Sequence, residues 1–343
     1  CKGCKAECPS NVDVARLKYE FLHYYYQQAG HRHRWRDYLF GYIDRFAHLG
    51  QPFGQLANWG LRQGWVRGLF SKAFGLAPER KLPTFAERPF RAPAVQLACP
   101  GSTIEQRLVF LLLDTFSEHF YPAAAWHSLY ALQQAGFQVT VLPLHGAGRT
   151  LISKGLLLAA RAHAERLIAA IKAVDPEGHL PVIGIEPSEI FTLSDEYPDF
   201  FPTDTYVQLL AQRAWMIDEF LVRHGQITAQ PDRPPVLLHG HCYQKARPPA
   251  ADGMPVGVAA TVAMLAQAGY PVEVVDAGCC GMAGAFGYEV EHYSLSLQVG
   301  EQRLFPAVRA ASPQVIVAAA GVSCQAQIED GTQRQAVHPI TLI

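Results

Sequence analysis

The stretch "AGYPVEVVDAGCCG" (268–281) decides the fold, because a short apolar run leads into two adjacent cysteines flanked by glycines. A similar stretch, "AGFQVTVLPLHGAG" (135–148), lies 133 residues earlier in the chain. Two further pairs of segments keep the same order: "FLLLDTFS" (110–117) over "PVLLHGHC" (235–242) at an offset of 125, and "VIGIEPSE" (182–189) over "VAAAGVSC" (317–324) at an offset of 135. Nearly constant offsets predict one structural unit built twice.

Short apolar runs alternate with helical stretches from about residue 96 onward. This alternation is typical of α/β architecture with a mostly parallel sheet. We therefore predict tandem α/β repeats preceded by a helical segment that begins in a cysteine motif. The expected divisions are a cysteine-bearing segment at 1–30, helices and a proline-rich linker at 31–95, a first repeat at 96–230 and a second repeat at 231–343.

The second repeat carries four cysteines directly after strand candidates: Cys242, Cys279, Cys280 and Cys324. Because the carboxyl ends of parallel strands open on one edge of a sheet, we expect these thiols to meet. Gly278 and Gly281 would let the backbone turn tightly beside a bulky group. Thiolate ligands suit an iron–sulfur cluster or zinc. A redox-active vicinal disulfide and a set of buried free cysteines are the alternatives.

Three motifs of the second repeat carry a family resemblance: "HGHCYQKA" (239–246), "AGCCGMAGAFGYE" (277–289) and "GVSCQAQI" (321–328). They resemble the cysteine-rich CCG domain of heterodisulfide reductases and of the iron–sulfur parts of glycolate oxidase and anaerobic glycerol-3-phosphate dehydrogenase. The chain's first 18 residues and "GRTLISKGLL" (148–157) resemble more closely the iron–sulfur, carboxyl-terminal half of bacterial FAD-linked 2-hydroxyacid dehydrogenases. The resemblance implies [4Fe–4S] clusters here and FAD on a part of the protein upstream.

The resemblance has one departure at the expected cluster. A full CCG motif ends in C-x-x-C, but Gln327 stands where a fifth thiol would be. The resemblance therefore leaves open whether the cluster is non-cubane or a four-cysteine [4Fe–4S] cubane. His239 and His241 either lie at the surface or donate hydrogen bonds and relay protons beside the cluster. We count His241 and Gly281 with the four cysteines as expected cofactor-binding residues.

The first repeat has no thiols at the corresponding positions. By the offsets above, these positions are Ser117, Gly146, Ala147 and Glu189. Because a site without soft ligands does not hold a cluster, we interpret this unit as a structural pseudo-repeat. Arg149 and Lys154 either face a substrate or adjacent domain, or belong to a solvated loop and helix start. Cys99 has no partner pattern and stays unassigned.

The amino-terminal stretch "CKGCKAECP" (1–9) has the spacing C-x2-C-x3-C-P. This spacing matches the last three cysteines of the bacterial ferredoxin motif C-x2-C-x2-C-x3-C-P. We therefore predict Cys1, Cys4 and Cys8 as cluster ligands in a truncated 4Fe–4S ferredoxin-type segment. On the ferredoxin pattern, Cys1 and Cys4 serve one cluster and Cys8 serves its neighbour. We expect the sequence to continue upstream of Cys1, and its other end to be cut short too.

Composition excludes several classes of protein. The 343 residues carry 29 Lys and Arg against 30 Asp and Glu, so the chain lacks the basic excess of a nucleic-acid binder. No apolar run approaches the ~18 residues of a membrane span, and residues 1–30 lack a signal-peptide core. "HRHRWR" (31–36) is predicted as a solvated face or as a docking surface for an acidic partner. Aromatic stripes over 35–75 are predicted to pack helices together.

These observations predict the iron–sulfur electron-transfer part of a FAD-linked oxidoreductase. Its substrate would be a 2-hydroxyacid such as D-2-hydroxyglutarate, D-lactate or glycolate. Electrons would come from a FAD-binding dehydrogenase domain or subunit and pass to a quinone or carrier protein. One alternative is a CCG-domain enzyme that reduces a disulfide or quinone directly at its cluster, and another is a zinc-stabilised interaction module. We expect a cytoplasmic location, with peripheral association at the inner face of the membrane as an option.

Overall fold

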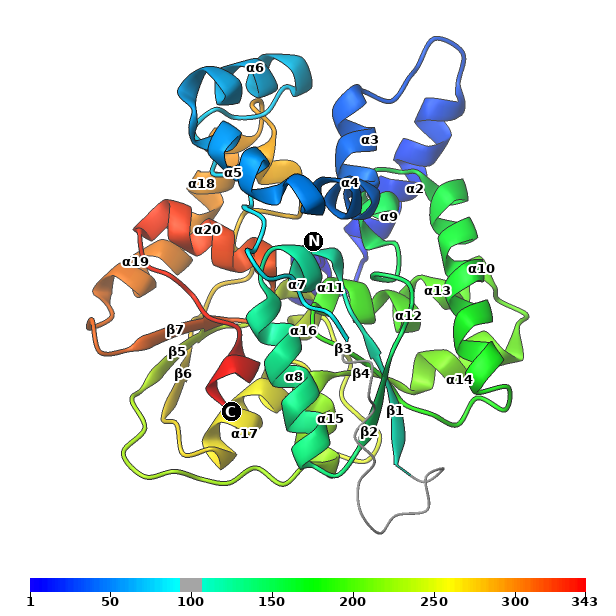
Figure 1. Cartoon of the computed structure of the whole chain (residues 1–343), viewed down its shortest axis with the longest axis vertical. Helices are drawn as coiled ribbons and strands as arrows, with labels where there is room; N and C mark the ends of the chain where they lie inside the picture. Colours follow the sequence, from blue (N-terminus) through cyan, green and yellow to red (C-terminus); the bar gives the residue numbers. More distant parts are fainter. Residues whose placement is uncertain (93–106) are drawn as a thin grey trace.

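The computed structural model describes residues 1–92 and 107–343 (Figure 1). The prediction for Cys99, like the end of the proline-rich linker, lies outside these residues. Within the described part, the strands form two separate sheets in which every pairing is parallel. The prediction of an α/β fold with parallel sheets is therefore confirmed.

The first sheet has the strand order β2-β1-β3-β4, and the second has the order β6-β5-β7. The strands of the first sheet are β1 (Leu108–Leu112), β2 (Gln138–Val141), β3 (Val182–Gly184) and β4 (Ala214–Met216). Those of the second are β5 (Val236–His239), β6 (Val272–Val274) and β7 (Ile316–Ala319). Beside β7, one isolated parallel bridge joins Ala318 to Val337. This bridge corresponds to the pairing of β3 with β4 in the first sheet.

Strand register shows that the two sheets repeat one pattern and corrects one of the offsets. The equivalent pairs are Val109–Val139 with Val236–Val272, and Phe110–Val182 with Leu237–Val317. The offset is 127 for β1, 133 for β2 and 135 for β3. The predicted offset of 125 for the β1 segment is therefore wrong by two residues. Thr115, not Ser117, corresponds to Cys242, because each is the first residue of the helix after its strand. The apolar run around β1 is longer than the one around β5, so several alignments of the two segments match apolar residues equally well.

Helices connect the strands in the same way in both repeats. In the first repeat α7 (Thr115–His119) and α8 (Pro122–Gln134) lead to β2, and α9 (Arg149–Ser153) and α10 (Leu157–Val174) lead to β3. In the second, α16 (Cys242–Lys245) and α17 (Val258–Gln267) lead to β6, and η3 (Phe286–Tyr288), α18 (Tyr293–Gln302) and α19 (Leu304–Ala310) lead to β7. The helix α20 (Val322–Thr332) and the turn η4 (Pro339–Leu342) complete the chain.

The remaining helices of the first repeat link its sheet to the second repeat. They are α11 (Pro187–Ile190), α12 (Thr192–Asp195), α13 (Tyr197–Phe200), α14 (Thr205–Gln212) and α15 (Ile217–His224). Figure 1 shows α8 and α15 between the two sheets. Leu132, Phe220, Met264 and Ile340, from α8, α15, α17 and η4, share one buried apolar cluster there. Burial of these side chains packs the two repeats into one body.

The amino-terminal helices lie above the two sheets in Figure 1, where they are blue. They are α1 (Gly3–Glu7), α2 (Val14–Gln27), α3 (Trp35–Gly41), α4 (Ile43–Gly50), the turn η1 (Gln51–Phe53), α5 (Gly54–Arg62) and α6 (Gly64–Phe74). No helix of the described residues is long and apolar enough to cross a membrane.

The basic stretch "HRHRWR" binds acidic residues of the second repeat. Arg34 donates to Glu291 at 2.8 Å, and Arg36 donates to the same carboxylate and lies 3.3 Å from Glu289. Lys154 of the first repeat also donates to Glu289, at 2.5 Å. The acidic partner is therefore part of the same chain, and the prediction that this stretch is a solvated face is wrong for the buried Arg36. Lys154 does not face a substrate, because this ion pair holds it.

Helix packing explains only part of the aromatic stripes. Leu61 and Phe70 of α5 and α6 face an internal cavity. Trp59 and Trp65 of the same helices are 58% and 71% exposed. The stripe was predicted to pack inward, but α5 and α6 have no further helix layer above them (Figure 1).

Arg80 ties the linker to the second repeat. It is 2% exposed, and its guanidinium donates to Asp330 at 2.8 Å, to Gln327 at 2.9 Å and to the Gly287 carbonyl at 3.0 Å. Gln327 in turn donates to the Ser296 carbonyl at 2.9 Å. Gln327, which stands where a fifth thiol would be, is therefore held by hydrogen bonds with Arg80 and Ser296.

Replacing Arg80 by methionine should destabilise the fold strongly. The change leaves a buried carboxylate and a buried amide without their partner, which costs about 3–5 kcal/mol. Lys81→Ala is the matched control, because Lys81 forms an exposed pair with Glu329 and its loss should cost less than about 1 kcal/mol. Urea unfolding of the three proteins measures both effects. Equal midpoints for the two variants would contradict the role given to Arg80.

Candidate metal centre

The carboxyl ends of β5, β6 and β7 bring the four predicted cysteines to one cavity. Cys242 is the first residue of α16, Cys279 and Cys280 follow β6, and Cys324 lies in the first turn of α20. The sulfurs of Cys280 and Cys324 and a ring nitrogen of His239 all lie within 4.8 Å of one another. All seven cysteines of the described residues are free thiols. The convergence that the strand pattern predicted is therefore present.

The vicinal thiols differ in acidity. The hydrogen bond from Cys280, together with the backbone N–H of Gly281 at 3.3 Å, lowers the pKa of Cys279 to about 6. Hydrogen bonds to Cys279 and Cys324, and then burial, raise the pKa of Cys280 well above its ordinary value. Cys279 is therefore a thiolate at neutral pH, which is the form that binds metals.

Histidines and a glycine shape the cavity around the thiols. His239 is 1% exposed, its Nδ1 has no hydrogen-bond partner among the described residues, and burial lowers its pKa to about 3. His241 instead caps α16 by accepting the Tyr243 N–H, and its Nε2 lies 3.9 Å from Glu186. Gly281 has φ +95°, and a Cβ there would meet the Ser296 carbonyl oxygen at 2.1 Å. Glycine is therefore required at this turn.

The amino-terminal segment reaches the same cavity, which the sequence did not indicate. The Cys1 sulfur lies 3.3 Å from the Cys279 sulfur, and the Lys2 N–H lies 3.4 Å from the sulfur of Cys242. The Lys2 side chain is buried and pairs with Asp195 at 2.7 Å and Glu196 at 3.2 Å. The Lys2 ammonium group therefore binds the amino-terminal segment to the first repeat, and Cys1 contacts the second repeat.

Cys4 and Cys8 lie apart from this convergence. Cys4 is exposed, and neither residue lines the cavity. Backbone N–H groups of Val12, Ser10 and Asn11 lower the pKa of Cys8, which favours its thiolate. The structure thus brings only Cys1 of the amino-terminal motif to the strand-end thiols.

In the first repeat, Glu189 occupies the position that corresponds to Cys324. Its Oε2 accepts the N–H of Ala147 at 2.6 Å and that of Arg149 at 3.3 Å. Ala147 corresponds to Cys280. The Glu189 carboxyl group therefore lies, in the first repeat, where the thiols of Cys280 and Cys324 lie in the second. The Arg149 guanidinium is held by Glu196 at 2.6 Å and lines the cavity.

One largely apolar cavity of about 560 Å³ connects these features. The four cysteines, Cys1, His241, Glu186 and Glu189 line one part of it. Side chains of α3 to α6 and of α7 line the rest, among them Phe40, Phe46, Leu61, Phe70 and Phe116. The thiols therefore open onto a hydrophobic space that the amino-terminal helices cover.

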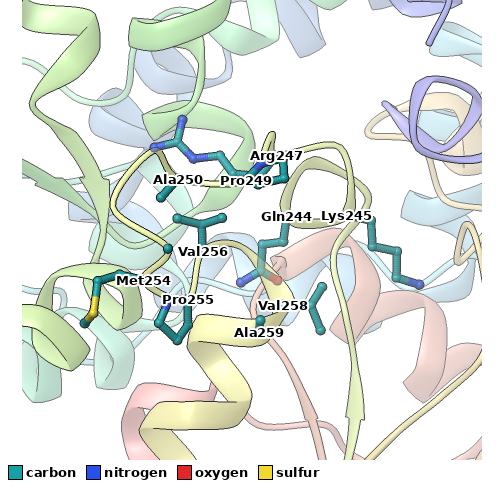
Figure 2. Close-up of a pocket in the computed structure, with 11 residues that line it drawn as sticks. Gln244, Lys245, Arg247, Pro249, Ala250, Met254, Pro255, Val256, Val258 and Ala259 are labelled. Carbon is teal, nitrogen blue, oxygen red and sulfur yellow. The ribbon is translucent and has the colours of Figure 1, made fainter. Parts of the chain in front are cut away.

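A second pocket of about 470 Å³ lies between α16 and α17 (Figure 2). Its lining is made by the loop that carries Pro249, Met254 and Pro255, and it contains no cysteine. Arg247 at its edge is already paired with Glu219 at 3.3 Å. This pocket therefore offers no soft ligand for a metal.

The donor set fits an iron–sulfur cluster. Four convergent thiols, one of them acidic, supply soft ligands, and backbone N–H groups already point at the sulfurs of Cys242 and Cys279. The unpartnered Nδ1 of His239 leaves one more donor at the site. A set of His239, Cys280 and Cys324 also suits zinc, so the geometry alone does not choose the metal.

Comparison with known proteins supports the resemblance carried by the cysteine motifs. The chain is 24% identical over 348 residues to D-2-hydroxyglutarate dehydrogenase of Escherichia coli K12 and 25% identical over 356 residues to that of Pseudomonas putida. It is also 25% identical over 350 residues to one subunit of the anaerobic glycerol-3-phosphate dehydrogenase of Escherichia coli K12. No protein-family model matches the chain.

The coverage of these matches is unequal. Nearly the whole chain is aligned in each, but it spans about one third (33%) of the D-2-hydroxyglutarate dehydrogenases and 82% of the glycerol-3-phosphate dehydrogenase subunit. The predicted resemblance is confirmed. The relatives are oxidoreductases or a subunit of one, and this chain corresponds to a part of the larger enzymes.

Replacing Cys279 or Cys280 by serine should abolish the cluster signal of the α/β part in electron paramagnetic resonance. An oxygen ligand is a poor substitute for thiolate at iron in such clusters. Thr115→Ala and Glu189→Ala are the controls, and iron content should not change in either, because the first repeat offers no soft ligand. An unchanged spectrum in the cysteine variants, or loss of iron in the controls, would contradict the assignment.

Proposed function

We propose that this chain is the iron–sulfur electron-transfer part of a FAD-linked dehydrogenase that oxidises a 2-hydroxyacid. The observation that carries the proposal is the meeting of the strand-end thiols with Cys1 of the ferredoxin-type segment. Electrons from a flavin on another part of the protein would pass through the amino-terminal cluster to the centre held by Cys242, Cys279, Cys280 and Cys324. The similarity to D-2-hydroxyglutarate dehydrogenases supports a substrate of that class.

The contact between Cys1 and Cys279 supports this order of electron transfer. With 3.3 Å between their sulfurs, a cluster that uses Cys1 as a ligand would lie against the second centre. Lys2 fixes that approach, because its buried ammonium group pairs with three carboxylates, those of Asp13, Asp195 and Glu196. The residues of this chain would therefore hold the two centres close together. When bound, the clusters supply one-electron transfer.

The cavity supports a quinone as the electron acceptor. It is largely apolar, it ends on the thiols, and its volume of about 560 Å³ is that of a small-molecule site. A disulfide substrate would have to reach the sulfurs themselves, and Cys242, Cys280 and Cys324 are buried. The second hypothesis from the sequence, direct reduction of a quinone at the centre, becomes the last step of the same electron path.

The exposed face of α4 to α6 supports docking at a membrane. Residues 45–78 contain no Asp or Glu. Its basic residues, Arg45, Arg62, Arg67 and Lys72, are exposed and form no ion pair within the described part of the chain. Leu49, Phe53, Leu56, Trp59, Trp65 and Leu69 are exposed beside them. A cationic, aromatic-rich face suits an anionic lipid surface. Because the same helices cover the cavity, a lipid-soluble quinone would enter from that side.

Metal analysis separates this proposal from a zinc-stabilised interaction module. Protein purified without oxygen should contain iron and acid-labile sulfide, and both should fall when Cys242, Cys279, Cys280 or Cys324 is changed to serine. Zinc without iron or sulfide would reject the electron-transfer proposal and favour the site of His239, Cys280 and Cys324 as a structural metal site.

Vesicle binding tests the membrane face. The chain should sediment with phosphatidylglycerol vesicles, less with phosphatidylcholine vesicles, and less at high salt, because each basic residue contributes about 1 kcal/mol near an anionic surface. The triple variant Trp59→Glu, Trp65→Glu, Leu69→Glu should lose at least about tenfold in affinity.

The control is Leu158→Glu, which places one such charge at an exposed leucine of α10. This variant should bind vesicles like the unchanged chain. If the unchanged chain does not sediment with anionic vesicles, or if the control loses as much affinity as the triple variant, the membrane assignment is wrong.

A further inference from the structure

The two repeats place different chemistry at equivalent positions around one cavity. In the second repeat Cys324 follows β7, and in the first repeat Glu189 follows β3 at the corresponding register. Both residues line the cavity. A quinone that accepts two electrons also needs two protons. The second repeat therefore offers thiols that can hold an electron-transfer centre. The first repeat offers a carboxyl group that can donate a proton.

We propose that Glu189 is the proton donor to the quinone that is reduced in this cavity, an inference that rests on the proposed function. Its Oε1 accepts no hydrogen bond from the described residues, while Oε2 is held by the backbone of Ala147 and Arg149. Glu186 is the other carboxyl group at the cavity, and both of its oxygens are engaged, by Ser188 and by the Val322 N–H at 3.0 Å. Glu189 is thus the carboxyl with an oxygen left to meet a ligand.

The surroundings of Glu189 favour its neutral form. Burial raises its pKa to about 8, and the nearby Asp114 and Glu186 carboxylates add to the shift. The N–H groups of Ala147 and Arg149 act in the opposite direction. The other polar groups around its loop are the Arg149 guanidinium, which Glu196 holds, the Tyr197 hydroxyl, which donates to the Ala147 carbonyl, and the His163 ring, which contacts the Gly146 carbonyl. The acid is therefore protonated at neutral pH and loses its proton above about pH 8.

The step balances with the proposed electron path. An iron–sulfur centre held by the four cysteines would supply the quinone with two electrons, one at a time, and a reduced flavin on another part of the protein would be their source. The Glu189 O–H bond breaks as a new O–H bond forms on one quinone oxygen, and the second quinone oxygen takes its proton from solvent. The carboxylate that remains is stabilised by the N–H groups of Ala147 and Arg149, and it regains a proton from solvent before the next turnover.

The test compares two acceptors in the iron-loaded chain after reduction with dithionite. Menadione takes up electrons and protons, whereas ferricyanide takes up electrons only. Glu189→Gln should slow menadione reduction about 10²-fold and leave ferricyanide reduction and the paramagnetic resonance spectrum unchanged. In the unchanged chain, menadione reduction should fall as the pH rises through about 8, and this fall should be absent in the variant. Glu165→Gln, at an exposed position on α10, should behave like the unchanged chain.

Infrared spectra of the chain without iron give a readout that does not depend on activity. The difference between the spectra of the unchanged chain and of Glu189→Gln should contain a protonated carboxyl band at pH 7 that disappears near pH 9. Asp218, whose pKa burial raises to about 7, contributes to both spectra and cancels. The inference is overturned if the variant reduces menadione at the unchanged rate, or if the difference spectrum lacks this band. If the unchanged chain reduces ferricyanide but not menadione, the quinone assignment fails as well, so the two failures are distinguishable.

Discussion

Parallel pairing of the central strand β5 with both of its neighbours is the constraint on which the centre depends. Since β5, β6 and β7 run in one direction, their carboxyl ends open at one edge, and the loops that follow must turn there. Cys242, Cys279, Cys280 and Cys324 all lie in those turns. Thiols separated by many residues in sequence thus become neighbours through backbone hydrogen bonds that involve none of their side chains.

Duplication explains why the cavity has two chemically different sides. The first sheet repeats the pattern of the second, and its strand ends carry Thr115, Ala147 and Glu189 in place of thiols. Of these three residues, Glu189 lines the cavity. Without thiols, the position that corresponds to Cys324 is occupied by the Glu189 side chain. The backbone that would surround a sulfur instead holds a carboxyl group through the same kind of N–H donors. One strand pattern thus places two different kinds of side chain at equivalent positions within a single chain.

The sequence was sufficient for the parts of the fold that depend on local pattern. Alternating apolar runs and the position of the cysteines predicted parallel sheets and the convergence of four thiols. The offset of 125 failed because apolar residues alone do not mark where β1 ends, and only its pairing with β2 fixes the register. The burial of Arg36 and Arg80 was also beyond the sequence, since their partners lie more than 200 residues away.

The contact of Cys1 with Cys279 could not be predicted, because spacing within a motif says nothing of what the motif touches. Lys2 gives this contact a consequence for the larger enzyme. Its ammonium group is anchored in the first repeat, while the cysteine beside it meets the second, so the segment crosses the seam between them. In the proposed electron path, Cys1 would therefore be held in place by both repeats at once. A shift in the packing between the repeats would therefore change the distance between the Cys1 and Cys279 sulfurs.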